Sequence, residues 1–444
     1  MRFEISRGGS GLTYEIRNIV LIANKLKEYG IDIIWENIGD PVQKGEKIPG
    51  WMKKVLTEII QEDESYAYSP TKGVDSTRQF IADRLNRRGK VQITPEDIIF
   101  FNGLGDAIAR AYSSIQVDAR MIMPEPTYST HFMAEVLHAS FPPNTYRLNP
   151  YNGWQPDMRE LEQKVRSHKA IVGILVINPD NPTGFVYPEE TLKHIVRIAK
   201  ENDLFLVFDE TYINIVYNGK NTVPLSDIVG NVPAISMKGI SKELPWPGAR
   251  CGWIEIYNAG KDPIFDRFIN TILHQKMSEV CSTTLPQLAI PKIMTHPEYQ
   301  NYLNERKKHY EKLSNIAYNI LKDVPCLMVN KSDGAFYMTI VFNESGLNSD
   351  QKLHIKNREV REFVENLVKG PIEHDKRFVY YLLAATGICV VPLTSFFTPL
   401  LGFRMTLLDK DEAEFKYVVK TIAEKITEYI NSSNKSLQTA INLS

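Results

Sequence analysis

The sequence predicts an α/β protein that has a mostly parallel central sheet with helices on both faces and a smaller α+β domain. Between residues 97 and 237, short apolar runs alternate with stretches of helical hydrophobic spacing. The runs are almost continuously apolar, which is typical of strands covered on both faces in a parallel sheet. A length of 444 residues gives room for two or three domains.

The N-terminal part predicts helices around one short strand. Apolar residues at helical spacing favour a helix from Asn18 that ends at Gly30, and a strand-like run follows at residues 31–35. Helices are then expected at residues 51–60 and 74–88.

The middle of the chain supplies the predicted parallel sheet. Helical spacing between the apolar runs favours intervening helices, as at residues 107–115 and 189–201. The expected strands of the sheet are residues 97–101, 120–123, 170–177, 204–208 and 234–237.

After a long helical stretch at residues 302–321, the chain changes to a mixture of strands and helices. The expected elements are strands at 335–342, 387–392 and 402–408 and helices at 358–368 and 412–430. We therefore divide the chain into an N-terminal segment that belongs to the small domain, a large domain, the small C-terminal domain and a polar tail, at residues 1–47, 48–310, 311–432 and 433–444.

Composition excludes several classes of protein. Lys and Arg total 52 and Asp and Glu total 53, so the charge balance argues against nucleic acid as the main partner. The four cysteines are widely spaced, which indicates a reducing compartment and suggests neither a disulfide scaffold nor a metal site. No signal-peptide core and no apolar run of membrane-spanning length is found, so we expect a cytoplasmic protein without a membrane partner.

Polar residues follow the first predicted strands at their carboxyl ends, where ligands bind in parallel sheets. Residues 102–106 (NGLGD) open a helix with small residues, and backbone N–H groups there could hold a phosphate. A proline-rich loop after the next strand presents Tyr128, a flat surface for stacking, and His131. Gly-rich turns are common, and a lone Tyr or His more often serves packing.

The following strand ends carry groups with stronger chemistry. Asn181 lies between prolines, and Asp209 ends a buried strand, where its charge needs a partner such as a cationic ring nitrogen. Lys242 could form a Schiff base, and Arg250, in a loop fixed by Pro and Gly, suits a phosphate. Together these groups describe a pocket for a planar, cationic, phosphorylated aromatic aldehyde, which is pyridoxal 5'-phosphate.

The sequence at these positions resembles the class I/II aminotransferases, pyridoxal-phosphate enzymes of the aspartate aminotransferase fold (fold type I). The most specific motifs are NPDNPTG at 178–184, DETY at 209–212 and SKELPWPGARCGW at 241–253. The resemblance extends from about Asn37 to Leu408. It implies an enzyme that moves an amino group between an L-amino acid and a 2-oxo acid.

The resemblance also implies roles for the residues around the cofactor ring. Lys242 matches the Schiff-base lysine, and Asp209 matches the partner of the pyridine nitrogen. Tyr212 and Asn181 match the hydrogen-bond partners of the phenolic oxygen, and Tyr128 matches the stacking residue. His131 matches the residue that supports Asp209 on the side away from the cofactor.

Phosphate, substrate and partner subunit have their own matching positions. The backbone of Leu104 and Gly105 matches the phosphate-binding turn, and Arg250 matches its arginine. Arg404 matches the arginine that binds the substrate α-carboxylate, assisted by the backbone of Gly39. The family is usually a homodimer, and Tyr68 matches a tyrosine that reaches the cofactor phosphate of the partner subunit.

Three features depart from the family pattern. Gly239 and Gly105 stand where hydroxyl residues are common, so the phosphate would depend more on Arg250, backbone and the partner's tyrosine. No arginine lies at residues 276–282 to bind a dicarboxylate side chain, which puts aspartate specificity in doubt. The segment at 343–377 is longer than usual; it could cover the pocket or reshape the small domain, and we favour a plain surface insertion.

Two alternatives come from other classes of function. The same fold and cofactor support lyase or decarboxylase chemistry of the C–S β-lyase type, because the cofactor accepts electrons in each case. A gene regulator would need a DNA-binding module, for which the chain before Asn37 is too short. Aromatic residues hint at apolar substrates, although packing in the small domain explains them as well: Tyr14, Trp35, Phe396 and Phe397.

Overall fold

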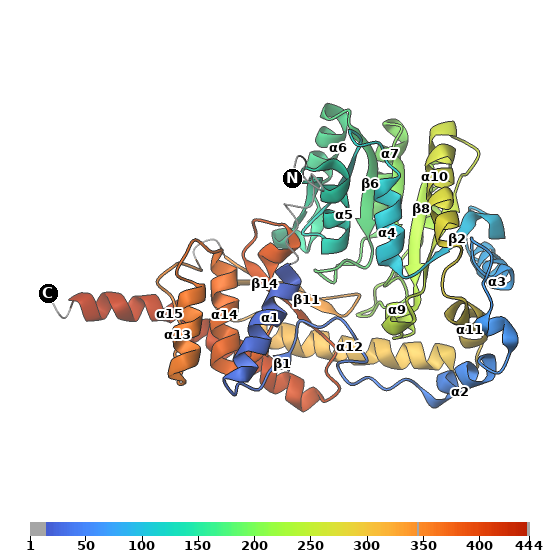
Figure 1. The fold of residues 1–444 in the computed structure, drawn as a ribbon. Helices are drawn as coiled ribbons and strands as arrows, with labels where there is room; N and C mark the ends of the chain where they lie inside the picture. The colour runs from blue at the N-terminus through green and yellow to red at the C-terminus, as the bar shows by residue number, and fades with distance from the viewer. Residues whose placement is uncertain (1–14, 344–345, 442–444) are drawn as a thin grey trace, which may run out of the picture.

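An eight-stranded sheet forms the centre of the larger part of the molecule (Figure 1). The computed structural model describes residues 15–343 and 346–441 of the chain. The strand order is β2-β9-β8-β7-β6-β3-β4-β5, and the neighbours from β8 to β4 are parallel. The predicted α/β class with a mostly parallel sheet is confirmed.

The apolar runs of the sequence became strands of this sheet at the expected places. They are β2 (Ile98–Phe101), β3 (Arg120–Glu125), β6 (Ile171–Ile177), β7 (Phe205–Asp209) and β8 (Ala234–Gly239). Successive side chains of a strand point to opposite faces. In β2, accordingly, Ile98 and Phe100 pack in one hydrophobic cluster and Ile99 and Phe101 in another.

The remaining strands of the sheet were not predicted. They are β4 (Asn144–Asn149), β5 (Gln155–Pro156) and β9 (Gly252–Tyr257). β9 runs antiparallel between β2 and β8, and its central Glu255 interrupts the apolar pattern. The charge of Glu255 is accommodated because Lys238 of the neighbouring strand lies 3.5 Å away, a contact between strands that the local sequence does not reveal.

Helices cover both faces of the sheet, as Figure 1 shows. One face packs against α4 (Leu104–Ser113), α5 (Ser129–Ala139) and α10 (Pro263–Glu279). The other face packs against α2 (Gly50–Ile59), α3 (Asp75–Asn86), α6 (Met158–Ser167), α7 (Glu189–Glu201) and α11 (Thr284–Met294). Two short helices lie near the ends of β7 and β8, namely α8 (Leu225–Ile228) and α9 (Ile240–Glu243).

The smaller part has a four-stranded antiparallel sheet in the order β10-β11-β14-β13. These strands are Leu327–Val329, Tyr337–Phe342, Gly402–Thr406 and Val391–Pro392. The helices of this part are α1 (Glu15–Glu28), α13 (Arg358–Leu367), α14 (His374–Thr386) and α15 (Glu412–Ile441). Strand β1 (Ile34–Trp35) pairs in parallel with β12 (Ile388–Cys389).

The long helix α12 (Tyr299–Leu321) runs beneath both parts (Figure 1). Its residues Tyr299 and Leu303 pack in a core of the large sheet, whereas Tyr310 and Leu313 pack in the core of the smaller part. Apolar residues of α1 share that second core with the C-terminal helices. The two ends of the chain therefore meet in one hydrophobic core.

The prediction of a surface insertion at residues 343–377 is wrong. Leu353, Ile355, Val360 and Val364 are buried in the core of the smaller part. The segment reaches this core because α13 presents one apolar face inward, at spacings of a helical turn. The segment also includes the start of α14, which was not predicted.

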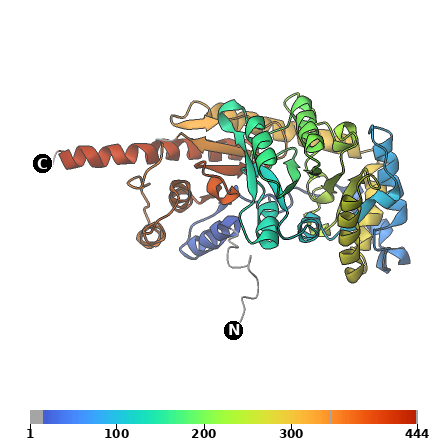
Figure 2. The same cartoon turned by 90° about the horizontal axis from the view of Figure 1, so that it is seen from above.

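The last helix is longer than predicted. α15 continues past residue 430 to Ile441, and Figure 2 shows it projecting from the rest of the molecule. Residues 431–441 contain no Gly or Pro to end a helix. Within residues 15–343 and 346–441, no helix combines the length and the apolarity needed to cross a membrane.

Candidate active site

Most predicted site residues gather at the carboxyl ends of the large sheet's strands, beside the smaller part. The ends of β6, β7 and β8 lie side by side because these strands are parallel neighbours. β2 runs in the same direction, since β9 is antiparallel to both β2 and β8. The polar residues that follow these strands therefore reach one region, as the rule for parallel sheets predicts.

Asp209, at the end of β7, is a buried carboxylate with organised partners. His131 Nε2 donates to its Oδ2 at 3.2 Å, and the backbone N–H and hydroxyl of Thr211 donate to its Oδ1 at 3.1 and 2.6 Å. Burial alone raises the pKa of Asp209, but the bonds from His131 and Thr211 outweigh it and hold the pKa below its ordinary value. Asp209 is thus a fixed negative charge.

His131 is fully buried and acts on Asp209 from behind. Its other nitrogen, Nδ1, lies 3.4 Å from the Tyr112 hydroxyl. With Nε2 donating to Asp209, Nδ1 is free to accept from this hydroxyl, which favours one tautomer of the ring. Tyr128 precedes α5 and meets the His131 ring edge-on, with centroids 6.3 Å apart.

Lys242 lies on α9, directly after β8. Its Nζ donates to the backbone oxygen of Gly39 at 2.7 Å. The short helix is held from behind by Arg306, which donates to the backbone oxygens of Lys242 and Glu243 at 2.9 and 2.8 Å. The ammonium group of Lys242 therefore projects from an anchored backbone toward the N-terminal segment.

Arg404, on β14, joins the smaller part to the site. Its guanidinium donates to Asn181 Oδ1 at 3.2 Å and to the Asn37 backbone oxygen at 2.9 Å. All three residues are buried. Asn181 comes from the loop after β6 and Asn37 from the segment before Gly39, so Arg404 lies where three distant segments converge.

Tyr212 and Tyr337 form a hydroxyl pair, and Tyr337 is a site residue that the sequence did not reveal. The Tyr212 hydroxyl donates to the Tyr337 hydroxyl at 3.1 Å, and the Arg404 guanidinium lies 4.3 Å from the centre of the Tyr337 ring. A Cβ atom at Gly39 would collide with the Tyr337 hydroxyl, so this close approach requires glycine. The GAFY run around Tyr337 predicted a strand, but not which face it would present.

The predicted phosphate turn and its arginine are in contact. α4 begins at Leu104 after Gly103, whose φ of 83° suits glycine. A Cβ at Gly103 would lie 2.5 Å from Arg250 Nη2, so the arginine packs against this turn. A Cβ at Gly105 would meet nothing within 4 Å, which leaves open space beside the helix N-terminus.

Tyr68 lies apart from the buried groups. Its side chain is 84% exposed, in the loop after the 3-10 turn Asp63–Tyr66. The neighbouring residue Ser69 donates to the Ser282 backbone oxygen at 3.5 Å, which places the loop against the end of α10.

The aromatic residues considered for substrate contact have different positions. Phe396 is buried and its ring lies 4.9 Å from the Arg404 guanidinium. Phe397 stacks on Phe132. Trp35 packs against the core of the smaller part, and Tyr14 is outside the described residues.

One buried acid next to Asn181 was also missed. Asp180 is fully buried, and its Oδ2 accepts from the N–H and hydroxyl of Thr183 at 3.1 and 2.5 Å. Burial raises the pKa of Asp180 to about 7, against the bonds from Thr183. The pKa values of Asp180 and Asp209, both buried, therefore shift in opposite directions. Each acid accepts two hydrogen bonds from a threonine, and Asp209 accepts a further one from His131.

These residues fit a planar, phosphorylated and cationic ligand such as pyridoxal phosphate. Asp209 offers a charge that stays negative in a buried place and would match a protonated ring nitrogen. The open space at Gly105, beside a helix N-terminus and Arg250, would accept a phosphate. Lys242, on the short helix that follows the neighbouring strand β8, would supply the amine.

Comparison with known proteins identifies the family. Residues 31–422 match the family model described as "Aminotransferase class I and II". An uncharacterized aminotransferase of Methanocaldococcus jannaschii is 55% identical over 428 residues, which are 96% of this chain and 99% of that protein. The glutamate-pyruvate aminotransferase of Escherichia coli is 28% identical over 346 residues, covering 77% of this chain and 83% of that protein.

A solved structure supports the same family assignment. An alanine aminotransferase from Pyrococcus furiosus superposes with a TM-score of 0.83 at 26% identity, covering 96% of this chain and all of that chain (100%). The chain therefore belongs to the class I and II aminotransferase family, whose members depend on pyridoxal phosphate. It is an aminotransferase, and the lyase alternative is not favoured.

Proposed function

We propose that this aminotransferase carries pyridoxal phosphate on Lys242 and uses it to exchange amino groups between L-amino acids and 2-oxo acids. The observation that carries the proposal is the buried, ionised Asp209 at the end of β7, beside the strand that leads into Lys242. A buried carboxylate kept charged in this way is a matched partner for a cationic ring.

Each part of the cofactor has residues that would hold it. The backbone of Leu104 and Gly105 and the guanidinium of Arg250 would bind the phosphate. Toward the ring, Asp209 would pair with the nitrogen and Tyr128 would lie against a face. The phenolic oxygen would be bound by Tyr212 and Asn181.

Pyridoxal phosphate supplies an electron-accepting ring when it is bound. Lys242 Nζ takes the proton from the substrate Cα and returns one to the product, acting as general base and acid. Arg404 binds the substrate α-carboxylate, since its guanidinium is already fixed by Asn181 and Asn37. His131 keeps Asp209 ionised and oriented.

The relatives suggest the first substrates to try. Because one is named a glutamate-pyruvate aminotransferase and another an alanine aminotransferase, we propose alanine and glutamate as amino donors, with pyruvate and 2-oxoglutarate as acceptors. Amino acid metabolism, including biosynthesis, is the corresponding role.

We further propose a homodimer in which Tyr68 reaches the cofactor phosphate of the partner subunit. Three exposed residues gather around the contact between its loop and the end of α10: Tyr68, Met277 and Val280 are 84%, 53% and 50% exposed. An apolar surface of this kind is typical of a subunit interface. A cytoplasmic location is also proposed, because all four cysteines are free thiols.

Borohydride trapping tests the proposal directly. The protein is incubated with pyridoxal phosphate, reduced, digested and analysed by mass spectrometry, and we expect the cofactor mass on the peptide containing Lys242. Lys238, on the same strand-to-helix segment, is the internal comparison. Labelling of Lys238 instead, or labelling that survives in Lys242→Ala, would refute the assignment.

Light scattering in solution tests the dimer separately. A mass of two chains is expected, and Tyr68→Ala should weaken cofactor affinity while it leaves Asp209 and Lys242 in place. A monomer with full activity would contradict the shared site.

A further inference from the structure

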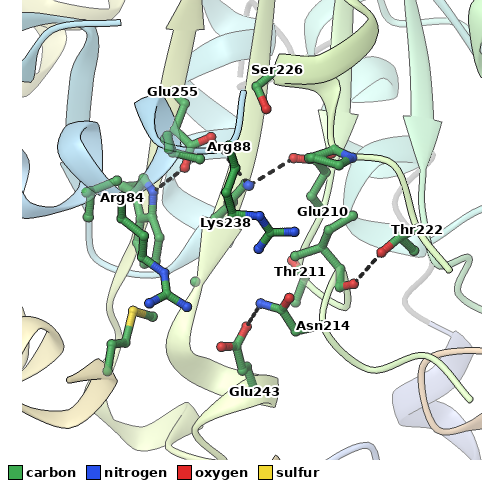
Figure 3. Close-up of a pocket in the computed structure, with 17 residues that line it drawn as sticks. Arg84, Arg88, Glu210, Thr211, Asn214, Thr222, Ser226, Lys238, Glu243 and Glu255 are labelled. Atoms are coloured by element: carbon green, nitrogen blue, oxygen red, sulfur yellow. Dashed lines mark hydrogen bonds and ion pairs between the residues drawn. The ribbon is translucent and has the colours of Figure 1, made fainter. Parts of the chain in front are cut away.

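A second polar pocket lies behind the candidate active site, between the end of α3, the loop after β7 and helix α9 (Figure 3). It encloses about 100 Å³. Six residues of its wall matter here: Arg84, Arg88, Thr211, Asn214, Lys238 and Glu243. By the same measure one water needs ~10–15 Å³, so the space exceeds what a single water fills.

At the base of the pocket, one ammonium group lies between two carboxylates. Lys238 Nζ lies 3.2 Å from Glu210 and 3.5 Å from Glu255. Glu210 also accepts from the Ser236 hydroxyl at 2.6 Å, and Glu255 accepts from Trp253 Nε1 at 3.0 Å. The ammonium group of Lys238 therefore forms ion pairs with both carboxylates.

The carboxylate on the α9 side has partners as well. Glu243 accepts from Asn214 Nδ2 at 2.7 Å and from the Tyr299 hydroxyl. The bonds come from neutral groups, and they hold Glu243 in place without a cation. The Thr211 hydroxyl, at the centre of the wall, donates to Asp209.

Two arginines remain without a carboxylate. Figure 3 shows the guanidinium groups of Arg84 and Arg88 directed into the pocket from the same wall. Among residues 15–343 and 346–441, no ion pair engages either group; Arg84 lies 6.0 Å from the centre of the Tyr299 ring. Guanidinium groups bind phosphate and carboxylate oxygens through paired N–H bonds.

We propose that this pocket binds a small oxyanion, the phosphate or carboxylate group of a small molecule, between Arg84 and Arg88. The second amide N–H of Asn214 is a further donor on the facing wall, since the first donates to Glu243. The site is separate from the turn at Gly103 and Arg250, where the cofactor phosphate is expected. The pocket adjoins the segments that carry Asp209 and Lys242, because Glu210, Thr211 and Glu243 are part of its wall.

Thermal unfolding of the protein saturated with pyridoxal phosphate tests the pocket, because the cofactor then fills the other phosphate site. Inorganic phosphate and acetate are titrated separately at constant ionic strength, with chloride as the reference salt. At a hundredfold excess over the dissociation constant, we expect the wild-type Tm to rise by about 2–3 °C. A rise with phosphate alone identifies a phosphate site, and a rise with acetate alone identifies a carboxylate site.

Variants assign the effect to the two arginines. Arg84→Gln/Arg88→Gln should lose the shift, and Arg88→Gln alone should weaken binding about tenfold. Arg87→Gln is the matched control, because Arg87 is adjacent in sequence and exposed like Arg88 but is not part of the wall. An absent shift in the wild type, or an equal shift in the double variant, overturns the proposal.

Discussion

The candidate active site and the oxyanion pocket lie on opposite sides of the segments that end β7 and β8, and they stabilise charge differently. Asp209 and Glu210 are consecutive acids at the end of β7. Asp209 is held by hydrogen bonds from His131 and Thr211, whereas Glu210 is paired with the ammonium group of Lys238.

The same contrast holds for the two lysines of the next segment. Lys238 lies within ion-pair distance of two buried carboxylates. Within the part of the chain that the structure describes, Lys242 has one hydrogen-bond acceptor, the backbone oxygen of Gly39. A group needed for chemistry must be able to leave its resting partner at little cost. The comparison supports Lys238 as a structural lysine and Lys242 as the reactive lysine that we propose, and the following predictions test this difference.

The largest effect is expected for Lys242→Ala. Its Nζ makes one hydrogen bond within the described residues, so the Tm should change little, while kcat should fall by at least ~10³-fold because the proposed general base is lost. Steady-state transamination and thermal unfolding measure the two quantities. Wild-type turnover in this variant would remove Lys242 from the mechanism.

Lys238→Met should show the reverse pattern. Removing the ammonium leaves Glu210 and Glu255 buried without a cation, and breaking a buried pair in this way costs about 3–5 kcal/mol of unfolding free energy. Denaturant unfolding measures the loss, and kcat per folded molecule should stay within about tenfold of wild type. Unchanged stability would show that the pair is not the structural element we infer.

Arg404→Lys should affect binding more than chemistry. A lysine keeps the charge but cannot reproduce the planar set of donors that reaches Asn181 and Asn37. We expect KM for the amino acid to rise by about 10–100-fold with a smaller change in kcat. A fall in kcat with an unchanged KM would place Arg404 outside substrate binding.

The smallest effect is expected for the contribution of Asp180 to the pH dependence of stability. Burial raises its folded-state pKa from an ordinary 3.8 to about 7, so the folded state binds the proton more tightly than the unfolded one. Its contribution to stability is fully present below pH ~4 and is lost as pH rises through about 7, at up to ~1.4 kcal/mol per pH unit. Asp180→Asn should remove this dependence.

Unfolding by denaturant at several pH values between 5 and 8 checks the Asp180 prediction. The stability of Asp180→Asn relative to wild type should increase with pH across this range. A constant difference would mean that Asp180 is already ionised in the folded protein.

The sequence predicted β3, β6, β7 and β8, four of the five strands in the parallel part of the sheet, because buried parallel strands are continuously apolar. Strand β9 was missed because Glu255 interrupts its pattern, and its burial depends on Lys238 from another strand. The segment at 343–377 was misjudged for a related reason, since only packing shows that Leu353 and Val360 belong to the core.

In the candidate site, strand-end position and motif together predicted Asp209, Lys242 and Asn181. Tyr337 could not be predicted, because its approach to Tyr212 depends on how β11 packs beside the large sheet. The pocket beside Arg84 could not be predicted either, because its wall combines α3, the loop after β7 and α9.

By itself, the sequence determined five of the eight strands of the large sheet, the family motifs and the chemical groups that follow these strands, since these depend on local apolar patterns and on residue type. The tertiary structure alone decided which groups are free to react. The fold brings His131 and Thr211 to Asp209 as hydrogen-bond donors and places Lys238 beside Glu210. It also places Arg84 and Arg88 in the wall of a pocket. Charge in a protein interior is controlled by neighbours that fold together from distant segments, and the linear order of residues does not specify them.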